Sequence, residues 1–123
     1  MRRALQLIAH GSRQPEANAD LIYFADEFRR RGDYDIVIAS FLELADPSIE
    51  QGSVLCVEQG AERVVLLPFF LSAGVHVRRD LTEARERLAA RFPHVDFRLA
   101  EPLGRHPLLL KVVEERASSA ELK

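Results

Sequence analysis

Ala4-Leu5-Gln6-Leu7-Ile8-Ala9 is a short and mostly apolar run, and it is the first indication of the fold class. It ends directly at His10. Two further apolar runs follow at residues 36–41 and 64–67, and residues 96–100 alternate between apolar and polar side chains. Continuous short apolar runs are typical of strands that are buried on both faces of a parallel sheet. The alternation in the fourth run instead predicts a strand with one wetter face.

Amphipathic segments separate these runs. Apolar residues recur in them at helical spacing, at Leu21, Phe24, Ala25 and Phe28 and again at Leu81, Ala84 and Leu88. Asp46 as an N-cap and Pro47 as the first helical residue predict a helix that ends at about Gly60. A last helix is predicted to begin at His106-Pro107 and to continue through Leu108, Val112 and Val113.

The resulting order, a strand and then a helix four times over, predicts an α/β protein with a four-stranded parallel sheet and helices on both faces. Right-handed crossovers in a doubly wound arrangement predict the strand order 2-1-3-4. We expect one domain over residues 1–117. Residues 118–123 have lost the apolar period and are predicted to be a frayed tail.

Composition excludes several classes of protein. The chain has 123 residues, of which 47% are hydrophobic and 29% charged, as in an ordinary globular domain. A net charge of -2 without a basic tail argues against a nucleic-acid partner. The apolar runs are too short for a membrane span or a signal peptide, so we expect neither. The single Cys56 has no partner for a disulfide or a CxxC metal site, which predicts a reducing, cytoplasmic location.

The predicted topology places a small set of polar residues at one edge of the sheet. In open α/β sheets, ligands bind beyond the carboxyl ends of the strands where the strand order reverses, here between strands one and three. His10 ends the first strand, Glu43 follows the second, His76 lies in the irregular loop after the third, and Glu101 ends the fourth. Two neutral imidazoles and a carboxylate suit a first-row divalent ion.

Other interpretations of these residues remain open. The two histidines do not form a local metal motif, so His10 as a turn cap and His76 as an exposed loop residue is an equal alternative. Ser12 and Arg13, before a helix, could bind an anionic group or form an ordinary turn. The Arg78-Arg79 pair would suit a polycarboxylate ligand but is also typical of solvated surface. Glu43 could serve the site or form an ion pair with Arg13 or Arg78.

Four segments together resemble the small CbiX-type sirohydrochlorin chelatases. They are Leu7-Ile8-Ala9-His10-Gly11-Ser12-Arg13, Phe41-Leu42-Glu43-Leu44-Ala45-Asp46-Pro47-Ser48-Ile49, Leu67-Pro68-Phe69-Phe70-Leu71-Ser72-Ala73-Gly74-Val75-His76-Val77 and Pro102-Leu103-Gly104-Arg105-His106-Pro107. The likeness extends from the first strand to about Val113. It implies the three-layer, flavodoxin-like chelatase fold.

The resemblance implies an ATP-independent enzyme that inserts a divalent metal into sirohydrochlorin, in cobalamin- or siroheme-type biosynthesis. Cobalt ranks first as the metal, with iron and nickel as alternatives, and no cofactor is expected beyond this metal substrate. His10 and His76 would hold the ion, and Glu43 would orient a histidine or accept a proton. The tetrapyrrole carboxylates would bind near Ser12, Arg13, Arg78 and Arg79. Half-sized members imply a homodimer that completes the cleft.

Each of three other protein classes predicts particular residues at these strand ends. A receiver domain would need an acidic cluster after the first strand and an Asp after the third, where this chain has His10 and Pro68. A histidine phosphatase would typically have Arg before its nucleophilic His, where this chain has Ala9. A non-catalytic carrier of a metal or a tetrapyrrole would keep both histidines, and it remains the alternative.

Overall fold

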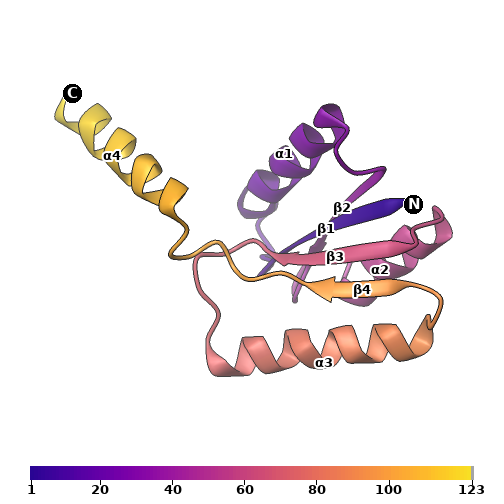
Figure 1. Ribbon diagram of the computed structural model, residues 1–123. Coiled ribbons are helices and arrows are strands. Elements are labelled where there is room, and N and C mark those ends of the chain that lie inside the picture. The colour runs from indigo at the N-terminus through magenta and orange to yellow at the C-terminus, as the bar shows by residue number, and fades with distance from the viewer. Residues whose placement is uncertain (123) are drawn as a thin grey trace.

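Four parallel strands form one sheet in the order β2-β1-β3-β4 (Figure 1). In a computed structural model, which describes residues 1–122, the strands are β1 (Arg3–Ala9), β2 (Ile36–Phe41), β3 (Arg63–Pro68) and β4 (Asp96–Leu99). The helices that alternate with them are α1 (Pro15–Arg31), α2 (Ile49–Glu58), α3 (Val75–Arg91) and α4 (Pro107–Glu121). The predicted α/β class and strand order are confirmed.

Two apolar clusters hold the layers together, one on each face of the sheet. On one face, Leu5 and Leu7 of β1 pack with Leu21 and Ala25 of α1. On the other face, β1 and β3 pack against α2 and α3 through a larger cluster that includes Ile8, Leu66, Cys56, Leu81 and Leu88. Full burial of one such side chain stabilises the fold by about 1.5–3 kcal/mol. Strand β1 is therefore buried on both faces, as its sequence predicts.

Strand β3 differs from β1, because only one of its faces is fully covered. Val64 and Leu66, which point toward α2 and α3, are completely buried. Val65 and Leu67, on the face that α1 shares, are only half-buried. The reason is that α1 packs mainly on β2 and β1. The α1 side of the sheet is thus incompletely covered over β3.

The start of α2 differs from the predicted start. The N-cap is Ser48 rather than Asp46, and the Asp46–Pro47 peptide bond is cis and lies in the preceding loop. Ser48 Oγ accepts a hydrogen bond from the Gln51 amide at 3.1 Å, and Gln51 Oε1 accepts one from the Ser48 amide at 2.9 Å. This capping box satisfies two backbone N–H donors at once. The predicted start, with Pro47 as the first helical residue, would not provide this pair of hydrogen bonds.

Helix α4 begins as predicted, with His106 as N-cap and Pro107 as its first residue. None of its residues is buried, and it projects away from the sheet (Figure 1). The helix continues through residues 118–121, where the sequence predicts a frayed tail; Ala120 and Glu121 are residue types with high helix propensity. Lys123 lies outside the described residues.

Two expectations from composition concern the membrane and the thiol. Within residues 1–122, no helix combines the length and the apolar character that crossing a bilayer requires. Cys56 lies on the buried face of α2, and this burial raises the pKa of its thiol to about 12. A thiol with this pKa stays protonated at neutral pH and does not offer a thiolate ligand.

A buried amide in the middle of β1 connects three elements. Gln6 of β1 is fully buried, and its Nε2 donates to Ser40 Oγ of β2 at 3.0 Å and to the Ile49 carbonyl of α2 at 2.8 Å. Its Oε1 accepts a hydrogen bond from Ser53 Oγ at 2.8 Å. Gly52 lies against this amide, where an added Cβ would be 2.7 Å from Gln6 Nε2. The first turn of α2 is thereby fixed to the sheet.

We predict that Gly52→Ala destabilises the protein by about 1–3 kcal/mol, because the new methyl group displaces an amide held by three hydrogen bonds. Urea unfolding followed by circular dichroism measures the loss. Glu58→Ala, an exposed position in the same helix, is the control and should change stability by less than about 0.5 kcal/mol. Equal stability of the two variants would contradict this account of Gly52.

Candidate functional site

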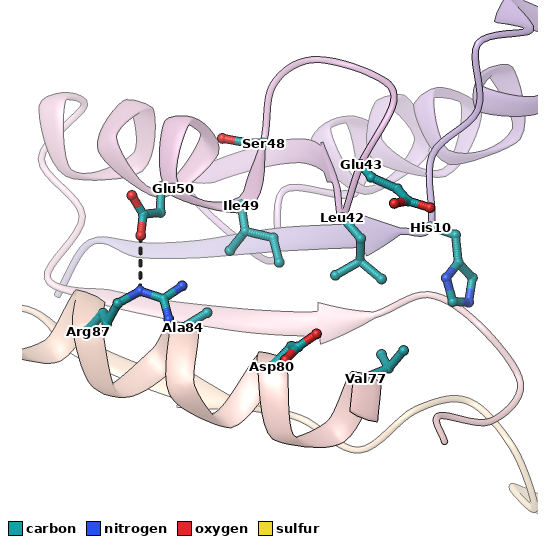
Figure 2. Close-up of a pocket in the computed structure, with 10 residues that line it drawn as sticks. All are labelled: His10, Leu42, Glu43, Ser48, Ile49, Glu50, Val77, Asp80, Ala84 and Arg87. Atoms are coloured by element: carbon teal, nitrogen blue, oxygen red, sulfur yellow. Dashed lines mark hydrogen bonds and ion pairs between the residues drawn. The ribbon is translucent and has the colours of Figure 1, made fainter. Parts of the chain in front are cut away.

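A pocket of about 470 Å³ opens at the carboxyl ends of β1 and β2, between α3 and the β2–α2 segment (Figure 2). Its lining comprises His10, Leu42, Glu43, Ser48, Ile49, Glu50, Val77, Asp80, Ala84 and Arg87. This is the edge of the sheet where the strand order reverses between β1 and β3. The structure therefore brings two of the predicted site residues, His10 and Glu43, to one pocket.

His10 is the first residue after β1, and its side chain is exposed at the mouth of the pocket. Its ring stacks on Phe70, with the ring centroids 4.5 Å apart and the planes inclined by 28°. Phe70 lies in the segment after β3, so the loops that follow two adjacent strands orient this imidazole. An exposed, oriented imidazole can bind a metal ion or exchange a proton.

The backbone around His10 and Glu43 is tightly packed. The amides of Leu42 and Glu43 donate to the carbonyls of Ala9 at 2.9 Å and His10 at 3.0 Å, which continues the pairing of β1 with β2 beyond the strands. Gly11 has a φ of 95°, and a Cβ there would lie 1.8 Å from the Glu43 carbonyl oxygen. Only glycine fits this close approach.

Glu43 has an exposed side chain that is directed toward His10 (Figure 2). Neither predicted ion-pair partner contacts it, because Arg78 instead pairs with Glu101 at 3.5 Å and Arg13 forms no ion pair within the described residues. The next residue, Leu44, has a φ of 63°, an unusual backbone conformation for a branched side chain. Such backbone strain is concentrated at functional sites.

The expected position of His76 in a loop is wrong, because α3 begins at Val75 and includes His76 in its first turn. Gly74 is the last residue before the helix, and nothing after it interrupts helical geometry. The side chain is exposed, and its Nδ1 lies 2.7 Å from Arg79 Nη2. Since a guanidinium only donates, Nδ1 is the acceptor, and its lone pair is occupied by Arg79.

The four residues expected to bind substrate carboxylates lie outside the pocket lining. Ser12 is engaged locally, because its amide and carbonyl both bond to the Asn18 side chain and its hydroxyl accepts from the Gln14 amide. The side chains of Arg13, Arg78 and Arg79 are exposed near the same edge of the sheet. His76 is likewise absent from the lining. Their roles toward a substrate stay predictions.

Sequence reasoning missed the contribution of α3 to the pocket. Val77, Asp80, Ala84 and Arg87 line it at helical spacing. Asp80 lies one turn after His76, and Arg87 pairs with Glu50 of α2 at 3.2 Å at the end of the pocket away from His10 (Figure 2). Their i, i+3, i+7, i+10 spacing places these four residues on one side of a helix, which is a signal that the sequence contains. Only two of the four are apolar, so the pattern of an amphipathic helix does not reveal this side.

The side chains that could bind metal are spread along the edge of the sheet rather than clustered. Among residues 1–122, no three His, Cys, Asp or Glu side chains come together closely enough to hold one ion. Stable binding of a first-row ion usually needs three or four ligands. In the described part of the chain, His10 and Glu43 alone do not make up such a set.

Fold and pocket define a small three-layer α/β protein that has an imidazole and carboxylates at the topological switch point of its sheet. Comparison with known proteins identifies the family within this class. Residues 4–120 match the CbiX family. The chloroplastic sirohydrochlorin ferrochelatase of Arabidopsis thaliana is 42% identical over 110 residues, which make up 89% of this chain and 49% of that protein.

Comparison with solved structures also finds a CbiX protein and a sirohydrochlorin chelatase. A CbiX protein from Marinobacter aquaeolei is 30% identical with a TM-score of 0.83, over 98% of this chain and 99% of that one. The sirohydrochlorin chelatase SirB of Bacillus subtilis subspecies spizizenii, in complex with cobalt, is 30% identical with a TM-score of 0.87, over 97% of this chain and 51% of that one. The chain belongs to the CbiX family. It spans about half the length of the curated relatives that it matches.

We predict that Gly11→Ala costs more than about 2 kcal/mol of stability, because it combines a left-handed backbone with a clash against the Glu43 carbonyl. Gly74→Ala is the matched control, since a Cβ at Gly74 meets nothing within 4 Å and its φ is -70°. Thermal unfolding compares the two variants. A tolerated Gly11→Ala would show that the contact between the two loops is not needed.

Proposed function

We propose that the protein is a sirohydrochlorin chelatase, which inserts a divalent metal into the tetrapyrrole without ATP. The observation that carries the proposal is the shared pocket of His10 and Glu43 in a chain that matches the CbiX family over residues 4–120. Relatives named as ferrochelatase and as a chelatase in complex with cobalt support this reaction class.

The proposed reaction exchanges one divalent cation for two protons of the pyrrole N–H groups. His10, exposed and oriented by Phe70, binds the incoming ion at the mouth of the pocket. Glu43, directed toward His10, accepts one proton as the ion moves to the macrocycle, and His10 accepts the other once it has released the ion. Arg13, Arg78 and Arg79 are exposed near this edge and attract the peripheral carboxylates.

His76 is the proposed second metal ligand. Its Nδ1 lone pair is engaged by Arg79, so binding through this atom requires the guanidinium to move away. A substrate carboxylate that draws Arg79 toward itself would free the imidazole at the same time. Substrate binding and metal binding would then be coupled through one side chain.

The metal is proposed to be cobalt first, with iron or nickel as alternatives. Two imidazoles and a carboxylate accept all three ions, and ligand type does not select among them. The proposed pathway follows the metal: cobalamin for cobalt, siroheme for iron. No cofactor beyond the metal substrate is proposed. A cytoplasmic location stays a prediction, and the Arabidopsis relative is named as chloroplastic.

A homodimer is part of the proposal. The pocket in one chain is open, and its metal-binding side chains do not form a complete set within residues 1–122. A second copy that faces this edge would close the pocket into a cleft and supply further ligands. Closed two-fold symmetry is the commonest way in which identical chains cover such surfaces.

The first experiment mixes the protein with sirohydrochlorin and Co²⁺, Fe²⁺ or Ni²⁺, and follows the visible spectrum against a control without enzyme. We expect faster metal insertion with at least one ion, and fastest with Co²⁺. If no ion gives acceleration, the chelatase proposal fails. Binding of sirohydrochlorin with an unchanged spectrum in the presence of metal would instead indicate the carrier alternative.

The second experiment tests the residues. His10→Ala and His76→Ala should each lower the insertion rate by about 10²-fold or more, since both remove a ligand to the transferring ion. His94→Ala is the matched control, because His94 is exposed near the opposite edge of the sheet and should retain the full rate. Near-normal rates in either site variant would remove that histidine from the mechanism.

A further inference from the structure

A second cavity, apart from the pocket of His10, lies between the segments that follow β3 and β4. It measures about 450 Å³, and its lining includes Ser72 and Arg78 from one segment and Glu101 and Arg105 from the other. We refer to it as the Arg78–Arg105 cavity. Two guanidinium groups and one carboxylate line it, so its formal charge is positive.

The backbone holds Arg105 at the edge of this cavity. The Leu103 amide donates to the Phe70 carbonyl at 3.0 Å, and Gly104 packs so closely on the loop after β3 that an added Cβ would lie 1.9 Å from the Leu71 carbonyl oxygen. Arg105 follows with a φ of 65°, a left-handed conformation that is unfavourable for a residue with a Cβ. Its guanidinium forms no ion pair within residues 1–122. The fold thus fixes the backbone of a cation that these residues do not neutralise.

Arg78 is the second cation of the cavity, and its only ionic partner within residues 1–122 is weakly held. Its Nε donates to the Ala73 carbonyl at 3.1 Å, and its Nη1 lies 3.5 Å from the Glu101 carboxylate. The side chains of Arg78 and Glu101 are 55% and 86% exposed. An ion pair so open to water contributes little free energy. An incoming carboxylate can therefore take the place of Glu101 at this guanidinium.

The pocket of His10 has the opposite charge. Glu43, Glu50 and Asp80 line it, and its one guanidinium, that of Arg87, is already paired with Glu50 at 3.2 Å (Figure 2). Such a set repels an anion and attracts a cation. The pocket and the Arg78–Arg105 cavity therefore suit different ligands: the pocket suits a metal ion, and the cavity suits a carboxylate.

We infer that the Arg78–Arg105 cavity binds one peripheral carboxylate of the tetrapyrrole and so sets the direction in which the macrocycle lies. Phe70 connects the two places, because its ring stacks on His10 and its carbonyl bonds to the segment that carries Arg105. From His10, the macrocycle extends across the loop after β3 toward the end of β4, and not along the acidic pocket toward Arg87. This inference rests on the proposed function, to which it adds Arg105 as an anchor of the substrate.

The first test measures the Kd of metal-free sirohydrochlorin from its visible spectrum during titration with the protein. Arg105→Gln should raise the Kd about five- to tenfold, because a charge-assisted contact at an exposed site is lost, and Arg105→Lys should recover part of this loss. Arg91→Gln removes the same charge at the far end of α3 and should change the Kd by less than about twofold. In the insertion assay, Arg105→Gln should raise KM and leave kcat within about twofold.

The second test predicts a change of opposite sign. Glu101→Gln should lower the Kd about two- to threefold, because Arg78 loses the carboxylate that competes with the substrate. Glu83→Gln makes the same change of charge at an exposed position of α3 and should have little effect. If Arg78 and Arg105 hold the same carboxylate, the double variant Arg78→Gln/Arg105→Gln should lose less affinity than the product of the two single losses.

The outcomes separate this inference from the chelatase proposal. A protein that inserts metal but binds sirohydrochlorin equally well after Arg105→Gln would overturn the anchor alone. A loss of affinity in Arg87→Gln, with none in Arg105→Gln, would place the macrocycle along the pocket and also overturn it. Binding that depends on Arg105 without any metal insertion would keep the anchor and favour the carrier alternative. A wild type that does not bind sirohydrochlorin would reject both.

Discussion

The buried amide of Gln6 is the constraint on which the rest of the pocket depends. It lies in the middle of β1, and it bonds to β2 through Ser40 and to the first turn of α2 through Ile49 and Ser53. A buried amide has to be fully bonded, because each unmade hydrogen bond costs about 1–3 kcal/mol. The network therefore admits one placement of α2 on the sheet. That placement fixes the α2 end of the loop that contains Glu43.

The fold could be predicted from the sequence because it depends on periodicity. Four apolar runs, four amphipathic segments and the handedness of crossovers are enough to give the strand order. The start of α2 could not be predicted in the same way. Asp46-Pro47 and Ser48 with Gln51 are both valid helix starts locally, and the choice between them depends on the tertiary bonds of Gln6.

The site was predicted only in part, for a related reason. Topology places residues that directly follow strands, so His10 and Glu43 were found together. Side chains on helices depend on rotation about the helix axis, which strand order does not specify. Asp80 was therefore missed. His76 was assigned to a loop for a different reason, because α3 begins after Gly74 without a side-chain cap that would mark its start. The contact between Arg79 and His76 follows from their i, i+3 spacing within α3, so it was missed for the same reason as the helix start.

The uncovered apolar surfaces of β3 and α4 have one physical origin. This chain places α2 and α3 on one face of the four-stranded sheet but only α1 on the other. The fourth helix instead projects away from the carboxyl edge of the sheet, which leaves Val65 and Leu67 of β3 half-buried.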